Sequence, residues 1–297
     1  MSPLPTPSVL AAELLKVRRR WLPYALLLVA VLGAAIHIWL LGYATWVDQN
    51  NEFDVFFRTE AFQTFALPHA LPALLETGQF WGSILVGILT ASVVGTEYSW
   101  GTVRQALLRG QTRSEYLTLK LIGLAILASA GLLAALAIGV LFSLIATALA
   151  DETAQGSTSF GAALLMVLRA AYTILPYGLL AFALTTVGRS TSLGVAGTLI
   201  FVVLESILIA IFGGIGSGWS ETARAFMPGH NVAAILGANR IEGGEFFSLA
   251  PREGLLPVEL PDAGAAAMVL ALYSAVFLAI AYWVFQRRDL AAEAGGT

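Results

Sequence analysis

Long stretches without a charged side chain dominate this sequence. They cover residues 21–47, 77–96, 121–150, 170–188 and 263–286, and residues 190–220 carry only Glu205. Each stretch is close to or above the ~20 residues that a helix needs to cross ~30 Å of hydrocarbon. No ten-residue segments of alternating polarity, the pattern of a membrane β-barrel, are evident. The pattern predicts an all-α integral membrane protein with six spans, at about 22–47, 76–96, 120–149, 164–188, 192–213 and 264–285.

Composition agrees with this interpretation. Of 297 residues, 58% are hydrophobic and 12% charged, with a mean hydropathy of +0.79, whereas soluble domains carry roughly 25% charged residues. The absence of cysteine excludes disulfides, thiolate catalysis and Cys-based metal sites. We treat residues 1–297 as a single transmembrane domain and expect no metal site and no nucleic-acid partner.

The positions of Lys and Arg predict the orientation. Eleven lie on one side of the predicted spans, namely Lys16, Arg18, Arg19, Arg20, Arg104, Arg109, Arg113, Lys120, Arg189, Arg287 and Arg288. Four lie on the other, namely Arg58, Arg224, Arg240 and Arg252, and Arg169 falls within a span. Because basic residues accumulate in cytoplasmic connections, we expect both termini and the connection after span two to be cytoplasmic.

The outer connections differ from the inner ones. Residues 48–75 are acidic and aromatic, and 150–163 are short and polar. The long connection 214–263 is rich in Gly and Pro, which mark turns. Within it, 219–238 predicts one or two short helices broken near Pro228-Gly229, some of which would dip back into the membrane.

The inner segment 97–113 contains signals for a short, separate helix. Thr102 followed by Gln105 fits a capping box, and Gly110 suits the left-handed residue that ends a helix. A second capping box, Thr112 to Glu115, begins the helix that continues into span three. Trp100, Val103 and Leu107 fall on one face. The alternative is a basic interfacial loop that only obeys the positive-inside rule.

The segment 93–120 resembles the connection between spans two and three of ABC-2-type transporter permeases. That pattern has a Glu at the end of span two, then Gly-Thr, a Leu pair, a Pro-containing turn, an Arg and a Lys that opens span three. This chain has Glu97, Gly101-Thr102, Leu107-Leu108, Arg113 and Lys120 in that order. It departs at the turn, where Gly110-Gln111 replaces the Pro. The remaining chain is similar only in its architecture.

The resemblance implies an ABC-2 (type V exporter-like) fold, in which two permease copies or paralogues form the pathway. Each would dock a separate ATPase subunit, which binds ATP and Mg, through the short coupling helix, usually for export. The implied coupling residues are Glu97, Trp100, Gly101, Thr102, Val103, Arg104, Leu107, Leu108, Gly110, Arg113 and Lys120. The chain itself lacks the G-x-x-x-x-G-K-[ST] phosphate-binding motif, so we expect neither ATPase activity nor a cofactor of its own. Permeases of this kind are often bacterial, so we expect a multi-pass protein of a bacterial plasma (inner) membrane.

Residues 8–21 predict a helix at the membrane interface. Leu10, Leu14, Val17 and Trp21 form an apolar stripe, and basic side chains lie mostly off it. In ABC-2 permeases, a helix in this place packs beside the coupling helix and meets the ATPase. The alternative is a membrane anchor with no other role.

Arg169, Glu205 and His37 lie well inside predicted spans. Arg169 and Glu205 lie at heights that differ by only ~6 Å when counted from the turn between their spans. We expect an ion pair or shared polar network that either fixes packing or serves transport, and Glu205 alone could bind a cationic substrate. His37 is a packing residue or, alternatively, a ligand. Four glycines would allow close helix approach, namely Gly131, Gly139, Gly194 and Gly197.

Other functions are compatible with parts of the sequence. A stand-alone secondary transporter or channel would use Glu205 and Arg169, although neither an inverted repeat nor further intramembrane carboxylates are evident. Gly216-Ser217-Gly218 superficially resembles a hydrolase nucleophile, but span six holds no His base. A purely structural membrane subunit also remains open. No motif identifies the substrate, and none indicates whether the chain pairs with an identical copy or with a paralogue.

Overall fold

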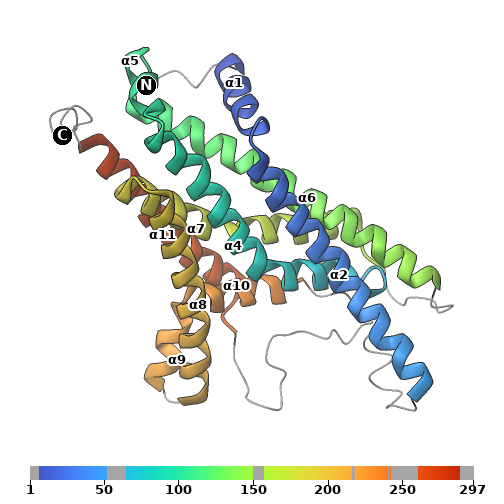
Figure 1. The fold of residues 1–297 in the computed structure, drawn as a ribbon. Helices are drawn as coiled ribbons and strands as arrows, with labels where there is room; N and C mark the ends of the chain where they lie inside the picture. The colour runs from blue at the N-terminus through green and yellow to red at the C-terminus, as the bar shows by residue number, and fades with distance from the viewer. Residues whose placement is uncertain are drawn as a thin grey trace.

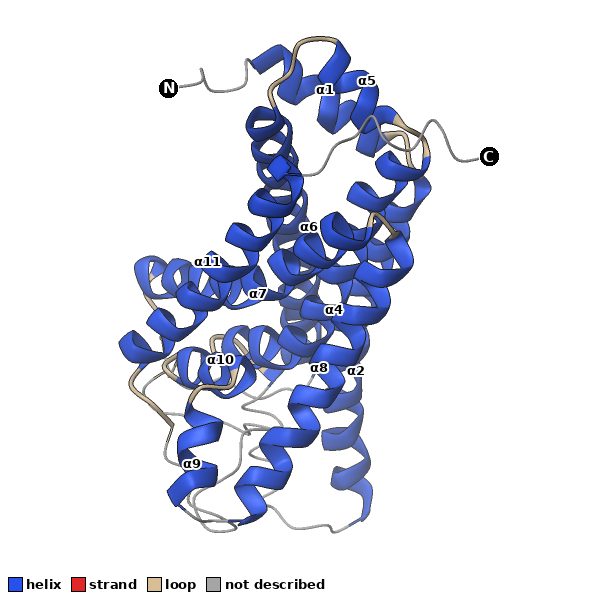
Figure 2. Ribbon diagram, turned by 90° about the vertical axis from the view of Figure 1, so that its left-hand side faces the viewer, coloured by secondary structure: helices blue, strands red, loops and turns tan. Residues whose placement is uncertain are grey.

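The computed structural model describes residues 7–51, 65–149, 157–215, 218–239, 241 and 260–287. Within these residues the regular structure is entirely helical (Figure 2). Six helices are long and apolar enough to cross a membrane, as predicted. They are α2 (Trp21–Asn51), α4 (Ala70–Ser99), α6 (Arg113–Leu149), α7 (Phe160–Gly188), α8 (Thr191–Ile215) and α11 (Ala263–Arg287). The shorter helices are α1 (Pro7–Arg18), α5 (Thr102–Leu108), α9 (Gly218–Ala225) and α10 (Pro228–Gly237).

Several helices run past the charge-free stretches that predicted them. α4 begins at Ala70 and α6 at Arg113, about one to two turns before the predicted starts at 76 and 120. A helix continues as long as its backbone hydrogen bonds are made, whereas the sequence pattern marks only its apolar part. Parts of the predicted outer connections, 52–64, 150–156, 242–259 and residues 216–217, lie outside the described residues, as do Arg58, Arg240, Arg252 and Arg288.

Helices α4 and α7 form the centre of the bundle. About half of the most apolar stretch of α4 and 44% of that of α7 are buried within the protein, against 11% for α2, α6 and α11. α8 and α11 pack against this pair, and α2 lies along α6 on the other side (Figure 1). The peripheral helices therefore leave most of their apolar side chains on the outside, as lipid-facing helices do.

Small residues bring the central helices together. A Cβ on Gly95 of α4 would lie 2.7 Å from the backbone of Thr191, at the start of α8. Gly194 and Gly197 approach α7, and Gly139 approaches Leu74 of α4, so these three predicted contact glycines are in close contacts. Gly131 is not, because a Cβ added there would meet nothing within 4 Å. That prediction was wrong because α6 turns this residue toward an open groove.

The predicted break within 219–238 is present. α9 and α10 are separated at Phe226 and Met227, and Pro228 occupies the first turn of α10, where its missing N–H is harmless. α10 is almost wholly buried and packs against α7, α8 and α11. This part of the long connection before α11 thus folds back into the bundle.

Candidate partner-docking site

The short helix α5 is set apart from its neighbours by two glycines with positive φ. Gly101 (φ 65°) and Gly110 (φ 94°) lie immediately before and just after it. Glycine adopts this conformation without the steric cost that a Cβ imposes. The chain can therefore leave α4, form two turns of helix and enter α6 within about a dozen residues.

The two predicted capping boxes have different outcomes. The second is confirmed: the Thr112 N–H donates to Glu115 Oε2 at 2.8 Å, and the Glu115 N–H donates to Thr112 Oγ1 at 3.2 Å. The first is wrong, because Gly101 is the N-cap and Thr102 already lies inside α5. The Thr102 hydroxyl instead donates to the Glu97 carbonyl at 3.2 Å, tying α5 to the last turn of α4.

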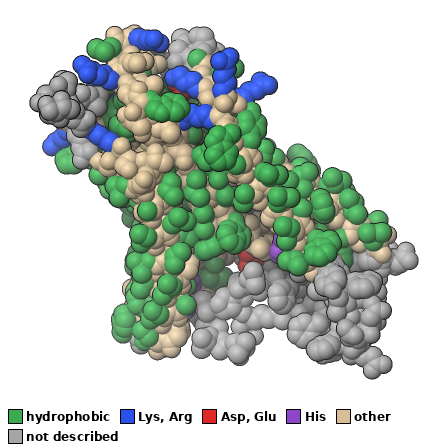
Figure 3. Space-filling view, in the orientation of Figure 1, with side chains coloured by type: hydrophobic (Ala, Val, Ile, Leu, Met, Phe, Trp, Pro, Cys, Tyr) green, Lys and Arg blue, Asp and Glu red, His purple; other side chains and the backbone are tan. Residues whose placement is uncertain are grey.

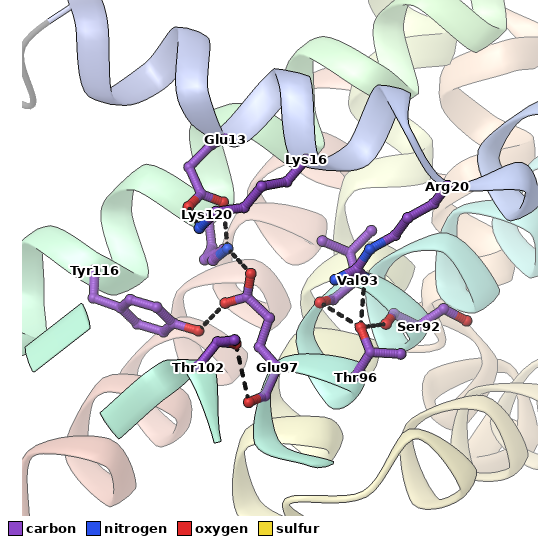
Figure 4. Close-up of polar contacts among 10 residues, drawn as sticks. All are labelled: Glu13, Lys16, Arg20, Ser92, Val93, Thr96, Glu97, Thr102, Tyr116 and Lys120. Atoms are coloured by element: carbon purple, nitrogen blue, oxygen red, sulfur yellow. Dashed lines mark hydrogen bonds and ion pairs between the residues drawn. The ribbon is translucent and has the colours of Figure 1, made fainter. Parts of the chain in front are cut away.

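A buried charge network lies beneath α5. The Lys120 ammonium of α6 donates to both the Glu97 carboxylate of α4 and the Glu13 carboxylate of α1, and the Tyr116 hydroxyl donates to Glu97 (Figure 4). The exposed fractions are 3% for Lys120, 4% for Glu97 and 9% for Glu13. A buried cation shared by two carboxylates is stable only while every member is present, since each one left alone would be an uncompensated buried charge. The network therefore joins three helices.

Sequence analysis placed Glu97 and Lys120 in one motif but missed Glu13 and Tyr116. Glu13 is the only acidic residue in the strongly basic segment 8–21, and that isolation was the available signal. Burial disfavours the Glu13 carboxylate, but the ammonium of Lys120, assisted by Lys16 at 2.6 Å, outweighs it and lowers the pKa of Glu13 below its usual value. α1 is thereby held against the bundle by an ionised carboxylate.

A second contact holds the junction of α1 and α2. The Arg20 guanidinium donates to the Thr96 hydroxyl of α4 (Figure 4). It also lies 4.8 Å from the ring centroid of Trp100. Cation–π contacts at such sites contribute about 0.5–1 kcal/mol. Trp100 itself is 64% exposed.

The two faces of α5 have different surroundings. Val103 is buried against the bundle and Leu107 is half-buried, whereas Leu108 is 78% exposed. The prediction that Trp100 falls on one face with Val103 and Leu107 was wrong, because the turn at Gly101 redirects the chain between Trp100 and Val103. The outer face is an exposed set, which we call the α5 platform: Trp100, Arg104, Gln105, Leu108 and Arg109.

Arg113 has a structural role beside this platform. Its guanidinium donates to the carbonyls of Phe285 at 2.9 Å and Gln286 at 2.8 Å, in the last turn of α11. A cation at this place satisfies carbonyls that have no partner within the helix and complements its dipole. Arg113 therefore joins the start of α6 to the end of α11.

Basic side chains gather at this end of the molecule. Figure 3 shows Lys and Arg side chains around α1, α5 and the neighbouring helix ends, above a surface where hydrophobic side chains predominate. Glu13 and Glu97, the acidic members of the network, are buried among them. The visible surface of this end thus combines positive charge with exposed apolar side chains.

The predicted ion pair between Arg169 and Glu205 is not formed. Arg169 donates to the Ala238 carbonyl at 2.9 Å and to Asn239 Oδ1 at 3.0 Å. Glu205 accepts from the Gly229 N–H and from the Tyr177 hydroxyl. The sequence calculation placed the two side chains at similar heights. However, α10 lies between them, with Glu205 at its N-terminus and Arg169 at its C-terminus. Both charges complement the dipole of α10.

His37, the third residue predicted inside a span, lies on α2 and lines a groove, and its Nε2 is buried with no hydrogen-bond partner among the described residues. The described residues contain no group of three or more His, Asp and Glu side chains placed to hold a metal ion.

Comparison with known proteins adds a family but no activity. The family model described as "Protein of unknown function (DUF2705)" matches residues 77–291, most of the chain, and the chain belongs to this family. A search of the curated proteins found no match. The matched region includes α5, Glu97 and Lys120 but begins after α1.

Proposed function

We propose that this DUF2705 protein is the membrane-spanning permease subunit of an ATP-binding cassette transporter, with the ABC-2 (type V exporter-like) fold. In this proposal the α5 platform docks a separate ATPase subunit, which binds ATP and Mg and drives export. Two copies, or one copy and a paralogue, form the pathway. The ABC-2-like order of residues from Glu97 to Lys120 motivates the proposal.

One observation carries it: a short exposed helix is rigidly connected to three other helices. The outer face of α5 is exposed, yet its base is joined to α4 by Thr102, and α4 is joined to α6 and α1 by the Lys120 network. A push on α5 would therefore reach two spans directly, rather than being absorbed by a flexible loop. A loop that served only as a basic anchor would need no such buried connection.

The charge distribution supports a cytoplasmic position for this end. The α1 segment, α5 and the end of α11 share one end of the bundle and carry most of its basic side chains (Figures 1 and 3). Basic residues favour the cytoplasmic side, which is where an ATPase and its ATP would be. The proposed location in a bacterial plasma membrane rests on the ABC-2 resemblance alone, because permeases of that kind are often bacterial.

The alternative of a stand-alone transporter that uses Glu205 and Arg169 has less support. Both side chains bond to the ends of α10 and hold it in place. A substrate would have to displace these contacts before it could bind either charge.

Purification of the tagged protein from its native membrane tests the proposal. We expect a stoichiometric ATPase with a phosphate-binding loop, identified by mass spectrometry and by ATP hydrolysis of the complex. Arg104→Glu combined with Leu108→Glu should release the ATPase, because both side chains are exposed on the platform. Arg287→Glu, a charge reversal at the same end but on α11, is the matched control and should retain it.

Two results would contradict the proposal. One is a protein that purifies without any ATPase under conditions that preserve its fold. The other is an ATPase that remains bound to the platform variant as tightly as to the control.

A further inference from the structure

An open groove runs along the membrane-spanning part of the protein. It has a volume of about 930 Å³ and lies between α2 and the helices α4, α6 and α7, with α1 at one end. This volume is at the upper end of the ~300–1,000 Å³ typical of small-molecule sites. Its walls are overwhelmingly apolar; Leu27, Leu85 and Ile174 are typical of them.

Three glycines from three helices keep this groove open. Gly33 of α2, Gly78 of α4 and Gly131 of α6 all line it, and a Cβ at any of them would meet nothing within 4 Å. Glycine in a helix interior costs about 1 kcal/mol relative to Ala, and in a membrane bundle it usually permits close helix packing. Here no helix of the described part of the chain fills the space. The glycines instead leave room for something from outside the chain.

The polarity of the groove changes along its length. One end reaches Arg18 of α1, beside the basic end of the molecule, and from there the walls are apolar for most of the length of α2. His37 lies 16 residues beyond Trp21, or ~24 Å along the helix. A positive charge at the membrane surface followed by a long apolar channel complements one class of molecule: an amphiphile with an anionic head and a long chain.

We propose that the groove is a binding site for an anionic membrane lipid, with its headgroup at Arg18 and its acyl chain along Gly33, Gly78 and Gly131. The bilayer supplies such lipids at the correct height and orientation, and basic residues near the surface attract them. This inference concerns α1, α2, α4 and α6 of a single chain and does not depend on the proposed ATPase partner.

Photocrosslinking tests this site in the full-length protein. The protein would be placed in phosphatidylcholine nanodiscs with phosphatidylglycerol that carries a diazirine in its acyl chain, and labelled peptides would be mapped after irradiation. We expect the label to concentrate in residues 23–40, 74–89 and 127–136. Phosphatidylcholine with the same diazirine chain should label these segments less.

Matched glycine variants provide the main control. Gly33→Leu and Gly131→Leu fill the groove without meeting protein atoms at Cβ, and each should lower labelling of these segments at least about tenfold, equivalent to ~1.4 kcal/mol. Gly161→Leu also places its Cβ in open space, but on α7 outside the groove, and should leave labelling unchanged. Equal melting temperatures for all three show that the fold is intact.

The headgroup contact has its own variant. Arg18→Gln should lower labelling by the anionic probe about fivefold, the effect of one basic residue near a membrane surface, and should not alter labelling by the phosphatidylcholine probe. If Arg18→Gln lowers labelling by both probes equally, Arg18 does not contact the lipid headgroup.

Two outcomes would overturn the proposal. Labelling spread evenly over all lipid-facing helices and insensitive to Gly33→Leu would mean that only the general lipid annulus is present. Alternatively, because the chain has no cysteine, a Gly33→Cys variant that crosslinks efficiently to a second copy would show that another protein chain fills the groove.

Discussion

Replacing Lys120 by Met should uncouple α1 from the bundle. Met preserves most of the length and apolar stem of Lys but removes the ammonium that Glu13 and Glu97 share. Glu13 and Glu97 are 9% and 4% exposed. Among the described residues, Glu13 would then keep only Lys16 as a side-chain partner, and Glu97 only the Tyr116 hydroxyl. Removing one member of a buried ion pair costs about 3–5 kcal/mol.

At ~1.4 kcal/mol per tenfold change, a loss of this size corresponds to a hundredfold or greater increase in the undocked population. Two measurements would follow it: the melting temperature from tryptophan fluorescence, and trypsin cleavage at the basic residues 16–20, in the last turn of α1 and its junction with α2. We expect a lower melting temperature and faster cleavage.

A charge-neutral background separates electrostatics from packing. We expect the cost of Lys120→Met to arise from two buried carboxylates that have lost their shared cation. Introducing Glu13→Gln and Glu97→Gln together with Lys120→Met should then recover most of the stability, because buried ion pairs often tolerate replacement by neutral groups. If the single variant Lys120→Met has the wild-type melting temperature and the wild-type resistance to trypsin, the reasoning is refuted. A loss that the neutral background fails to recover would assign the effect to packing.

Three further perturbations test other parts of the structure. Lowering the pH below 4.5, the usual pKa of a Glu carboxyl, should weaken α1 docking, because the pKa of Glu13 is depressed in the folded protein and its contribution is lost as pH falls through that lower value. Hydrogen exchange of the α1 amides, corrected for the intrinsic exchange rate at each pH, measures the docking, and equal protection at pH 7 and pH 3 would contradict this prediction. Gly95→Ala should destabilise the bundle by about 1–3 kcal/mol because its Cβ would lie 2.7 Å from the backbone of Thr191, whereas Gly131→Ala, which meets nothing, should be neutral or stabilising in the same melting assay. Glu205→Ala should increase hydrogen exchange in α10, since it removes the acceptor of the first amide hydrogen bond of that helix. Unchanged exchange would show that Glu205 does not stabilise the start of α10.

Local signals in the sequence predicted the features that depend on a few neighbouring residues. The Thr112–Glu115 capping box and the break before Pro228 both formed where expected, because backbone capping and proline geometry act within one helical turn. The Thr102 box failed by a single residue. Gly101 took the N-cap position by adopting positive φ, a choice decided by how α5 packs rather than by the four residues of the motif.

Contacts between helices were predicted less well, since they depend on rotation about each helix axis. The calculation that matched the heights of Arg169 and Glu205 used the rise along the helices, which the sequence supplies. It did not include the position of α10, whose contacts lie 24 residues from Glu205 and 69 residues from Arg169 along the chain. The same limit explains Glu13: its distance from Lys120 is 107 residues in sequence, and only the docking of α1 beside α6 brings them together.

The sequence alone determined that this is a helical membrane protein with six apolar spans and one strongly basic end, because transfer of apolar side chains into lipid depends on composition and length. The tertiary structure alone decided which charges became partners, which face of α5 stayed exposed, and that Gly131 lines a groove instead of a helix contact. Those outcomes depend on packing, in which each helix selects its neighbours through shape and buried polar groups that are distant in sequence.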